Sequence, residues 1–121
     1  ISLGELVDKI SILIIKQKNI TDETKLDHVK KELDFLQKTL MNYVQQEEIN
    51  NYLENLININ SKLWNIEDDI RECERKKLFD QSFIDLARSV YFTNDERAKV
   101  KNDINKTFGS ELVEVKSYEE Y

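Results

Sequence analysis

Apolar residues recur along the chain at helical spacing, and this pattern predicts most of the secondary structure. The first stretch opens at Ser2 with Glu5 three residues later, the spacing of a capping box. Its apolar positions are Leu3, Leu6, Val7, Ile10, Leu13 and Ile14, with Ile12 and Ile15 beside them. Because these positions cover more than one side, we expect a helix that is buried on several sides and ends near Asn19.

Two longer stretches alternate apolar steps of three and four, which is the spacing of a coiled-coil seam. The first stretch follows an N-cap at Thr21 or Asp22, and its positions are Leu26, Val29, Leu33, Leu36, Leu40 and Tyr43. The positions of the second are Ile49, Tyr52, Leu56, Ile59, Leu63, Ile66, Ile70 and Cys73. The two seams are out of phase, so we predict a turn between Val44 and Ile49 and an antiparallel hairpin of two long helices. One long stuttered helix is the alternative, because neither Gly nor Pro marks the turn.

The last third of the chain predicts two more helices. The first begins at the N-cap Asp80 and carries Phe83, Leu86, Ala87 and Val90. Thr93 and Glu96 then form a second capping box, which predicts that one helix stops there and another begins. The inner face of this new helix holds Val100, Ile104 and Phe108. Gly109 follows, where a helix C-terminus favours a residue at positive φ.

These elements predict an all-α fold: a coiled-coil-like antiparallel hairpin of long helices with additional helices packed on it. The absence of Pro and the presence of only two Gly among 121 residues argue against a turn-rich all-β fold. We expect a single helical domain over residues 1–108. The acidic tail, residues 109–121, is expected to be extended and docked on the helices.

Charge and cysteine content limit the possible partners. The net charge of −6 argues against nucleic-acid and membrane-surface binding, although residues 71–106 are net basic and hold every arginine. The lone Cys73 excludes an internal disulfide and suits the cytoplasm, and its seam position predicts burial. No apolar run is long enough to span a membrane. The chain begins at Ile1 without Met, so a targeting segment could have preceded it.

The arginine-bearing half offers the only candidate ligand site. The exposed amides of a helix start bind anions, and nearby cations and polar groups would assist. The candidate ligand-binding residues are Arg71, Arg88, Tyr91, Asn94, Arg97 and Lys101. The competing interpretation is a helix junction with ion pairs, because Asp95 and Glu96 already occupy the positive helix end.

No catalytic residue and no metal site is predicted. Asp69 and Glu72, with Glu5 and Asp8, have the spacing of carboxylates that bind Mg²⁺ in all-α nucleotide hydrolases, but their order and context differ from that family. His28 is the only histidine and is expected at the surface, so a Ser–His or Cys–His pair is poorly supported.

Four segments together resemble a family of short helical domains with no assigned function, found in bacteria and phages. They read SLGELVDKISIL, LWNIEDDIRECE, FIDLARSVYFTNDERAKVKNDIN and GSELVEVKSYEEY. The resemblance covers Ile1 to Tyr121 and implies no reaction, cofactor or partner. Some members of this family are joined to glycosyltransferase-like or repeat domains. The resemblance implies that the family's signature includes Arg88, Asn94, Asp95, Arg97 and the tail at Lys116 to Tyr118.

Our leading hypothesis is a non-enzymatic helical interaction and assembly module. We expect it to be a homodimer with a further, unknown protein partner, without a cofactor, in the cytoplasm of a bacterium or a phage-infected cell. The alternative is a small anionic-ligand-binding domain or enzyme that uses Arg71, Arg88 and Arg97. A Mg²⁺-dependent nucleotide hydrolase is the weaker alternative.

Overall fold

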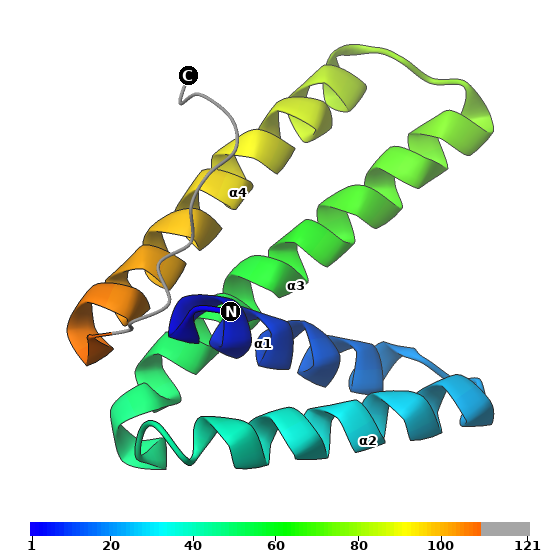
Figure 1. Cartoon of the computed structure of the whole chain (residues 1–121). Helices are drawn as coiled ribbons and strands as arrows, with labels where there is room; N and C mark the ends of the chain where they lie inside the picture. Colours follow the sequence, from blue (N-terminus) through cyan, green and yellow to red (C-terminus); the bar gives the residue numbers. More distant parts are fainter. Residues whose placement is uncertain (110–121) are drawn as a thin grey trace.

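The computed structural model describes residues 1–109, and within this range all regular structure is helical (Figure 1). The helices are α1 (Leu3–Asn19), α2 (Glu23–Leu40), α3 (Gln46–Lys76) and α4 (Gln81–Phe108). The all-α prediction is therefore confirmed. The expected docking of the tail concerns residues 110–121, which lie outside the described part of the chain.

Local capping signals define most of the helix ends. The Ser2 hydroxyl accepts from the backbone N–H of Glu5 at 3.1 Å. The Asp22 and Asp80 carboxylates accept from the N–H groups of Lys25 and Phe83, at 2.9 Å and 3.3 Å. Each contact satisfies an N–H group that has no partner within its own helix. At the other end of α4, Gly109 adopts a left-handed φ of 62°, as its position predicts.

The predicted break at Thr93 is wrong, because α4 runs without interruption from Gln81 to Phe108. Thr93 lies in the middle of this helix and is 1% exposed. A Thr–x–x–Glu spacing is compatible with a helix interior as well as with a start, since neither residue costs much there. Here the apolar stripe continues through Val100 and Ile104 on the buried side, so packing favours one helix over two.

The second and third helices are separate, but they do not form the predicted hairpin. α2 ends at Leu40, and a turn over residues 41–45 leads into α3, whose length of 31 residues matches the long helix expected. α2 packs only on α1, whereas α3 packs on α1 and α4. The antiparallel long-helix pair is thus α3 with α4 (Figure 1). Tyr43, assigned to the first seam, lies in the turn and is exposed.

α1 is the central element, because it alone contacts all three other helices. The hydrophobic core forms around its apolar residues, and the buried members on the four elements and the turn are Leu6, Val7, Ile10, Leu13, Val29, Leu33, Leu40, Val44, Ile49, Leu56 and Ile104. Fully burying one such Leu or Ile contributes about 1.5–3 kcal/mol. The expected burial of α1 on several sides is confirmed.

The far end of the α3–α4 pair extends beyond α1 and α2 (Figure 1). In this distal part, as far as the described residues go, each long helix packs only against the other. Ile70 and Cys73 of α3 are therefore only half-buried, and the prediction that Cys73 is buried is wrong. Within the described residues, no helix is long and apolar enough to cross a membrane.

Close contact between α1 and α4 depends on Gly4. A Cβ atom at this position would lie 2.3 Å from the backbone oxygen of Lys101, far inside van der Waals contact. α4 could relieve this clash only by moving away from α1, which would loosen the contacts on both sides. A glycine is therefore required in the first turn of α1.

Gly4→Ala should lower the free energy of unfolding by about 1–3 kcal/mol, the usual cost of overpacking. Helix propensity alone predicts the opposite sign, because Ala favours a helix over Gly. Urea unfolding followed by circular dichroism measures the difference. The matched control is Thr24→Ala, at the equivalent first-turn position of α2 but exposed, which should change stability by less than about 0.5 kcal/mol. A Gly4→Ala protein as stable as the wild type would contradict the close packing.

Candidate functional site

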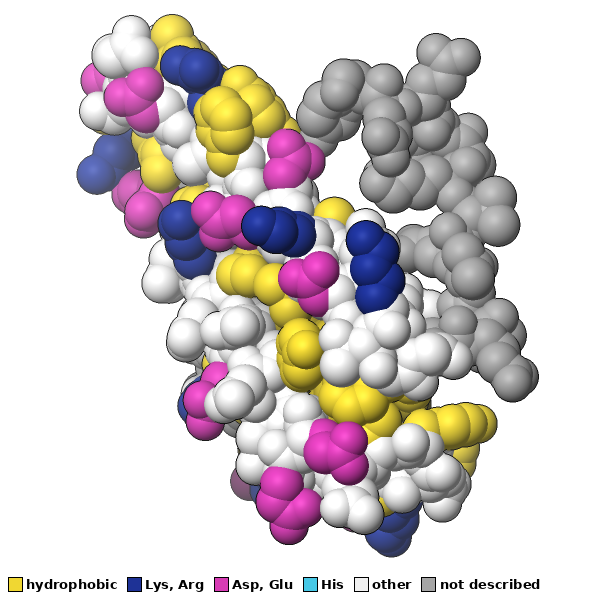
Figure 2. All heavy atoms as spheres, turned by 90° about the vertical axis from the view of Figure 1, so that its left-hand side faces the viewer, with side chains coloured by type: hydrophobic (Ala, Val, Ile, Leu, Met, Phe, Trp, Pro, Cys, Tyr) yellow, Lys and Arg dark blue, Asp and Glu magenta, His cyan; other side chains and the backbone are white. Residues whose placement is uncertain are grey.

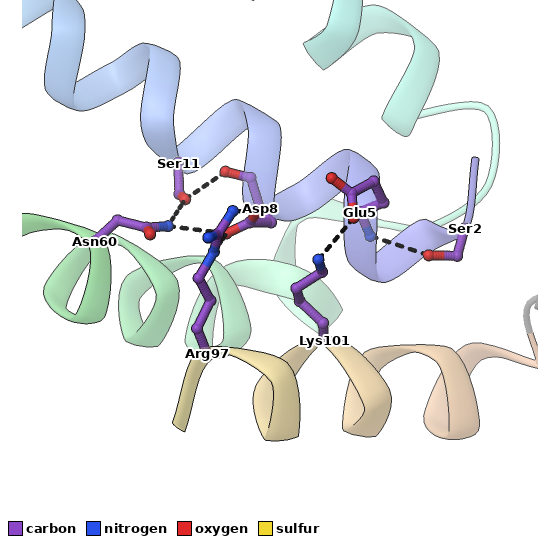
Figure 3. A network of polar contacts seen from close by, with 7 residues as sticks. All are labelled: Ser2, Glu5, Asp8, Ser11, Asn60, Arg97 and Lys101. Carbon is purple, nitrogen blue, oxygen red and sulfur yellow. Dashed lines mark hydrogen bonds and ion pairs between the residues drawn. The ribbon is translucent and has the colours of Figure 1, made fainter. Parts of the chain in front are cut away.

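The described structure contains one enclosed polar cluster, where α1, α3 and α4 meet (Figure 3). Its centre is the Asp8 carboxylate, which is only 1% exposed. Ser11, one turn further along α1, and Asn60 of α3 are also buried. Arg97 reaches this cluster from α4, with 28% of its side chain exposed. Polar side chains from three helices thus meet around one carboxylate.

Each buried polar group in the cluster has a partner. Arg97 donates to Asp8 through two nitrogens, with Nε at 2.9 Å from Oδ1 and the second nitrogen on Oδ2. Asn60 Nδ2 donates to Asp8 Oδ1 at 2.9 Å and to the Ser11 hydroxyl oxygen at 2.8 Å. The Ser11 hydroxyl donates in turn to the backbone oxygen of Asp8 at 2.6 Å. A bidentate guanidinium–carboxylate pair of this kind is strong and directional.

Two further polar contacts join α1 to α4. Together with the Arg97–Asp8 pair, they attach α4 to the first turns of α1 at three successive positions. Lys101 Nζ lies 2.6 Å from Glu5 Oε2, and Asn105 Oδ1 accepts from the backbone N–H of Gly4 at 2.7 Å. Arg97, Lys101 and Asn105 are spaced by four residues and therefore lie on one face of α4. The Glu5 carboxylate of the predicted capping box thus pairs with α4 instead of its own helix start.

This cluster is suited to holding helices in register. The Asp8 charge is neutralised by Arg97, and its oxygens accept from groups of the protein itself. A general base would instead need a carboxylate within reach of a substrate proton. We therefore interpret the cluster as a structural clamp between α1, α3 and α4.

The six predicted ligand-binding residues do not form one site. Arg71 lies at the distal end of α3, on the exposed surface, where it pairs with Asp68 at 2.7 Å. Arg88 and Tyr91 lie on the outer side of α4 and contact each other, with Arg88 Nε donating to the Tyr91 hydroxyl at 3.2 Å. This hydrogen bond raises the pKa of the Arg88 guanidinium.

The other three predicted residues, Asn94, Arg97 and Lys101, do lie together. With Ala98 they line a shallow hollow on the surface of α4. Arg97 and Lys101 nevertheless direct their charged groups at Asp8 and Glu5 (Figure 3). Arg97 thus forms an ion pair whose partner is a buried carboxylate.

The carboxylate pairs considered for Mg²⁺ are not brought together. Glu5 and Asp8 pair with Lys101 and Arg97, whereas Glu72 pairs with Arg75 in distal α3, which lowers the pKa of the Glu72 carboxyl. Among residues 1–109, no group of three or more His, Cys, Asp or Glu side chains could hold a metal ion. His28 lies exposed on α2, as predicted.

Sequence reasoning missed the residues that organise the clamp: Gly4, Ser11, Asn60 and Asn105, and the structural role of Asp8. One signal was present. Asp8 and Ser11 are polar positions inside a stripe predicted to be buried on several sides, and Asn60 lies between Ile59 and Leu63 of a seam. A polar residue in a buried stripe requires a partner. The partner, Arg97, lies 89 positions away and cannot be identified from spacing.

Residues 1–121 match the family of unknown function DUF6165 over their whole length, and the chain belongs to this family. This confirms the expected membership in a family without an assigned function. No curated protein and no solved structure matches the chain significantly.

Arg97→Ala should lower the free energy of unfolding by about 3 kcal/mol, because it leaves a buried, unpaired carboxylate at Asp8. Arg71→Ala is the matched control, since it also removes an arginine from an ion pair but at an exposed position, and should cost about 1 kcal/mol or less. Chemical denaturation of both variants gives the comparison. Equal losses for the two variants would show that the clamp does not stabilise the fold.

Proposed function

We propose that this protein is a non-enzymatic helical module that assembles with protein partners through the distal part of its α3–α4 pair. The observation that carries the proposal is a cluster of exposed hydrophobic side chains, which we call the distal surface. Its residues are Leu78, Phe79, Ile84, Tyr91 and Phe92.

The distal surface holds most of the large hydrophobic side chains that are exposed within residues 1–109. Four others are exposed, and they lie in the first 43 residues: Ile1, Phe35, Met41 and Tyr43. Figure 2, which faces the α4 side, shows hydrophobic side chains near the end where α3 and α4 are joined, beside basic and acidic ones. Apolar clusters rimmed by charges are typical of protein–protein contact sites.

The arrangement of the helices explains why this surface is uncovered. The inner side of distal α4 carries Phe83, Leu86 and Val90, which are half-buried. Ile84 and Tyr91 lie on another side of the same helix and are 46% and 44% exposed. A helix that is apolar on two sides needs two partners, and within the described residues distal α4 has only α3.

Contacts between aromatic rings hold side chains of the distal surface in place, so that the surface is preformed for binding a partner. The Tyr91 and Phe92 rings lie 4.8 Å apart between centroids, and the Arg88 guanidinium lies 5.8 Å from the Phe92 centroid. Phe79 packs edge-to-face on Phe83 at 5.1 Å. Rigid aromatic side chains lose little conformational freedom on binding and are enriched at interface centres.

The proposal includes the cytoplasm of a bacterium or a phage-infected cell as the working compartment. The half-buried thiol of Cys73 and the absence of a second cysteine in the sequence support a reducing environment.

The alternative, an anionic-ligand site, has one observation in its favour, namely the hollow lined by Asn94, Arg97 and Lys101. Its weakness is that Arg97 and Lys101 already neutralise Asp8 and Glu5. A ligand would have to compete with a buried pair, at a cost of several kcal/mol. Among residues 1–109 the distal surface has no such internal competitor, and assembly is therefore the better supported function.

Site-specific photocrosslinking in cells tests the proposal. A benzophenone side chain at Phe92 should yield covalent protein adducts. The same group at Phe35 on α2, which is more exposed at 68%, should yield few. The comparison separates a specific surface from mere exposure. Equal yields at both positions, or no adduct at Phe92, would contradict assembly through the distal surface.

A further inference from the structure

We propose that the partner of the distal surface is a second copy of this chain, docked antiparallel along the outer face of α4, with the two-fold axis at Tyr91. This inference rests on the proposed function and specifies its partner. Three features of α4 support it. They are a stripe of residues with a repeat of seven on the outer face, a hollow that the partner's stripe can reach, and a pair of opposite charges that can meet their counterparts on the second copy.

The outer face of α4 carries a stripe with a repeat of seven. Ile84, Tyr91 and Ala98 recur at this interval, which places them on one side of the helix. Thr93 and Ile104 are the buried positions of α4 and lie on the other side, toward α1 and α3. The stripe therefore faces away from the rest of the described chain, and Ile84 and Tyr91 are among its exposed apolar residues.

The residues that line the hollow on α4 have the spacing of a hole in a coiled coil. It is lined by Asn94, Arg97, Ala98 and Lys101, which are spaced i, i+3, i+4 and i+7. Four residues at this spacing receive one side chain of a facing helix. Nothing outside α4 lines this hollow among the described residues, so a facing helix could reach it.

A two-fold axis at Tyr91 brings a side chain to this hollow. Ile84 and Ala98 are each seven residues from Tyr91, in opposite directions. In an antiparallel pair the partner's Ile84 therefore lies opposite Ala98, one of the four residues that line the hollow. By symmetry Ile84 fills the same hollow of the partner, and the two Tyr91 rings meet at the axis.

The flanking charges favour the same arrangement. Arg88 lies three residues before Tyr91 and Asp95 lies four after it, on the same flank of the stripe. An antiparallel pair with its axis at Tyr91 places Arg88 near the partner's Asp95, and this contact occurs twice. A parallel pair would instead place the two copies of this flank on opposite sides of the seam, so that Arg88 could not meet the partner's Asp95.

Arg88 and Asp95 can exchange their contacts within the chain for contacts in the dimer at little cost in free energy. Arg88 is exposed and hydrogen-bonded to Tyr91, and Asp95 is exposed and interacts within its own chain. Exposed polar pairs of this kind contribute little to stability. The stripe from Ile84 to Ala98 spans about 21 Å at 1.5 Å per residue, so we expect a reversible dimer and not a permanent one.

The decisive experiment is a charge exchange in the full-length chain, measured by sedimentation equilibrium from about 1 µM to about 200 µM, a range that brackets a micromolar Kd. Arg88→Glu and Asp95→Arg should each weaken self-association at least about tenfold, because each places like charges opposite one another twice. The double variant restores opposite charges and should recover most of the wild-type affinity. Arg71→Glu, at an exposed position of α3, is the control and should leave the dimer unchanged.

Three results would overturn the inference: a wild-type chain that stays monomeric over this range, single variants that dimerise like the wild type, or a double variant that is no better than the single ones. Circular dichroism of each variant verifies that the helices are intact.

A disulfide at the axis provides a second test that does not depend on charge. In a Cys73→Ser background, Tyr91→Cys should form a covalent dimer with oxidised glutathione as the oxidant, since the two thiols meet at the two-fold axis. Gln37→Cys, exposed on α2, is the control and should form mainly the mixed disulfide with glutathione. Equal dimer yields at both positions would contradict the axis.

The photocrosslinks at Phe92 separate failure of this inference from failure of the proposed function. Adducts of twice the chain mass support the second copy. Adducts with other proteins only would leave the assembly function standing and overturn the dimer. An intrachain crosslink to residues 110–121 would assign this face to the tail and overturn the dimer as well.

Discussion

The buried carboxylate of Asp8 is the constraint on which the arrangement of the helices depends. An ionised carboxylate that loses water must be paired, or burial costs several kcal/mol. Here the pairing comes from Arg97 of α4, while Asn60 of α3 supplies a further donor. Three helices must therefore lie in one register, because any slide along an axis would separate the donors from the carboxylate.

The packing around Asp8 reinforces this register sterically. Gly4 lets the backbone of α4 approach α1 at Lys101, and Asn105 then accepts from the Gly4 amide. Polar contacts specify position, and the apolar core around Val7 and Ile10 supplies most of the favourable free energy. The two are complementary, since hydrophobic packing alone tolerates shifts that a bidentate ion pair does not.

The clamp also divides α4 into two parts with different environments. The half that contains Arg97, Lys101 and Ile104 is held against α1. Within residues 1–109, the half that begins at Gln81 has only α3 beside it and keeps a second apolar side exposed. The proposed assembly depends on this division, because the half of α4 that is held against α1 fixes the orientation of the distal half. Preorganisation of this kind lowers the entropic cost of binding.

The sequence by itself determined the helical class, most of the helix caps and the long α3, because these depend on local spacing and on side chains within one turn. Ser2, Asp22, Asp80 and Gly109 act as their positions predict. Only the tertiary structure decided that α3 pairs with α4, that the helix continues through Thr93, and that Arg97 meets Asp8. An apolar seam indicates that a helix is buried but does not identify the helix against which it packs. Contacts over 89 positions depend on how all four helices pack at once.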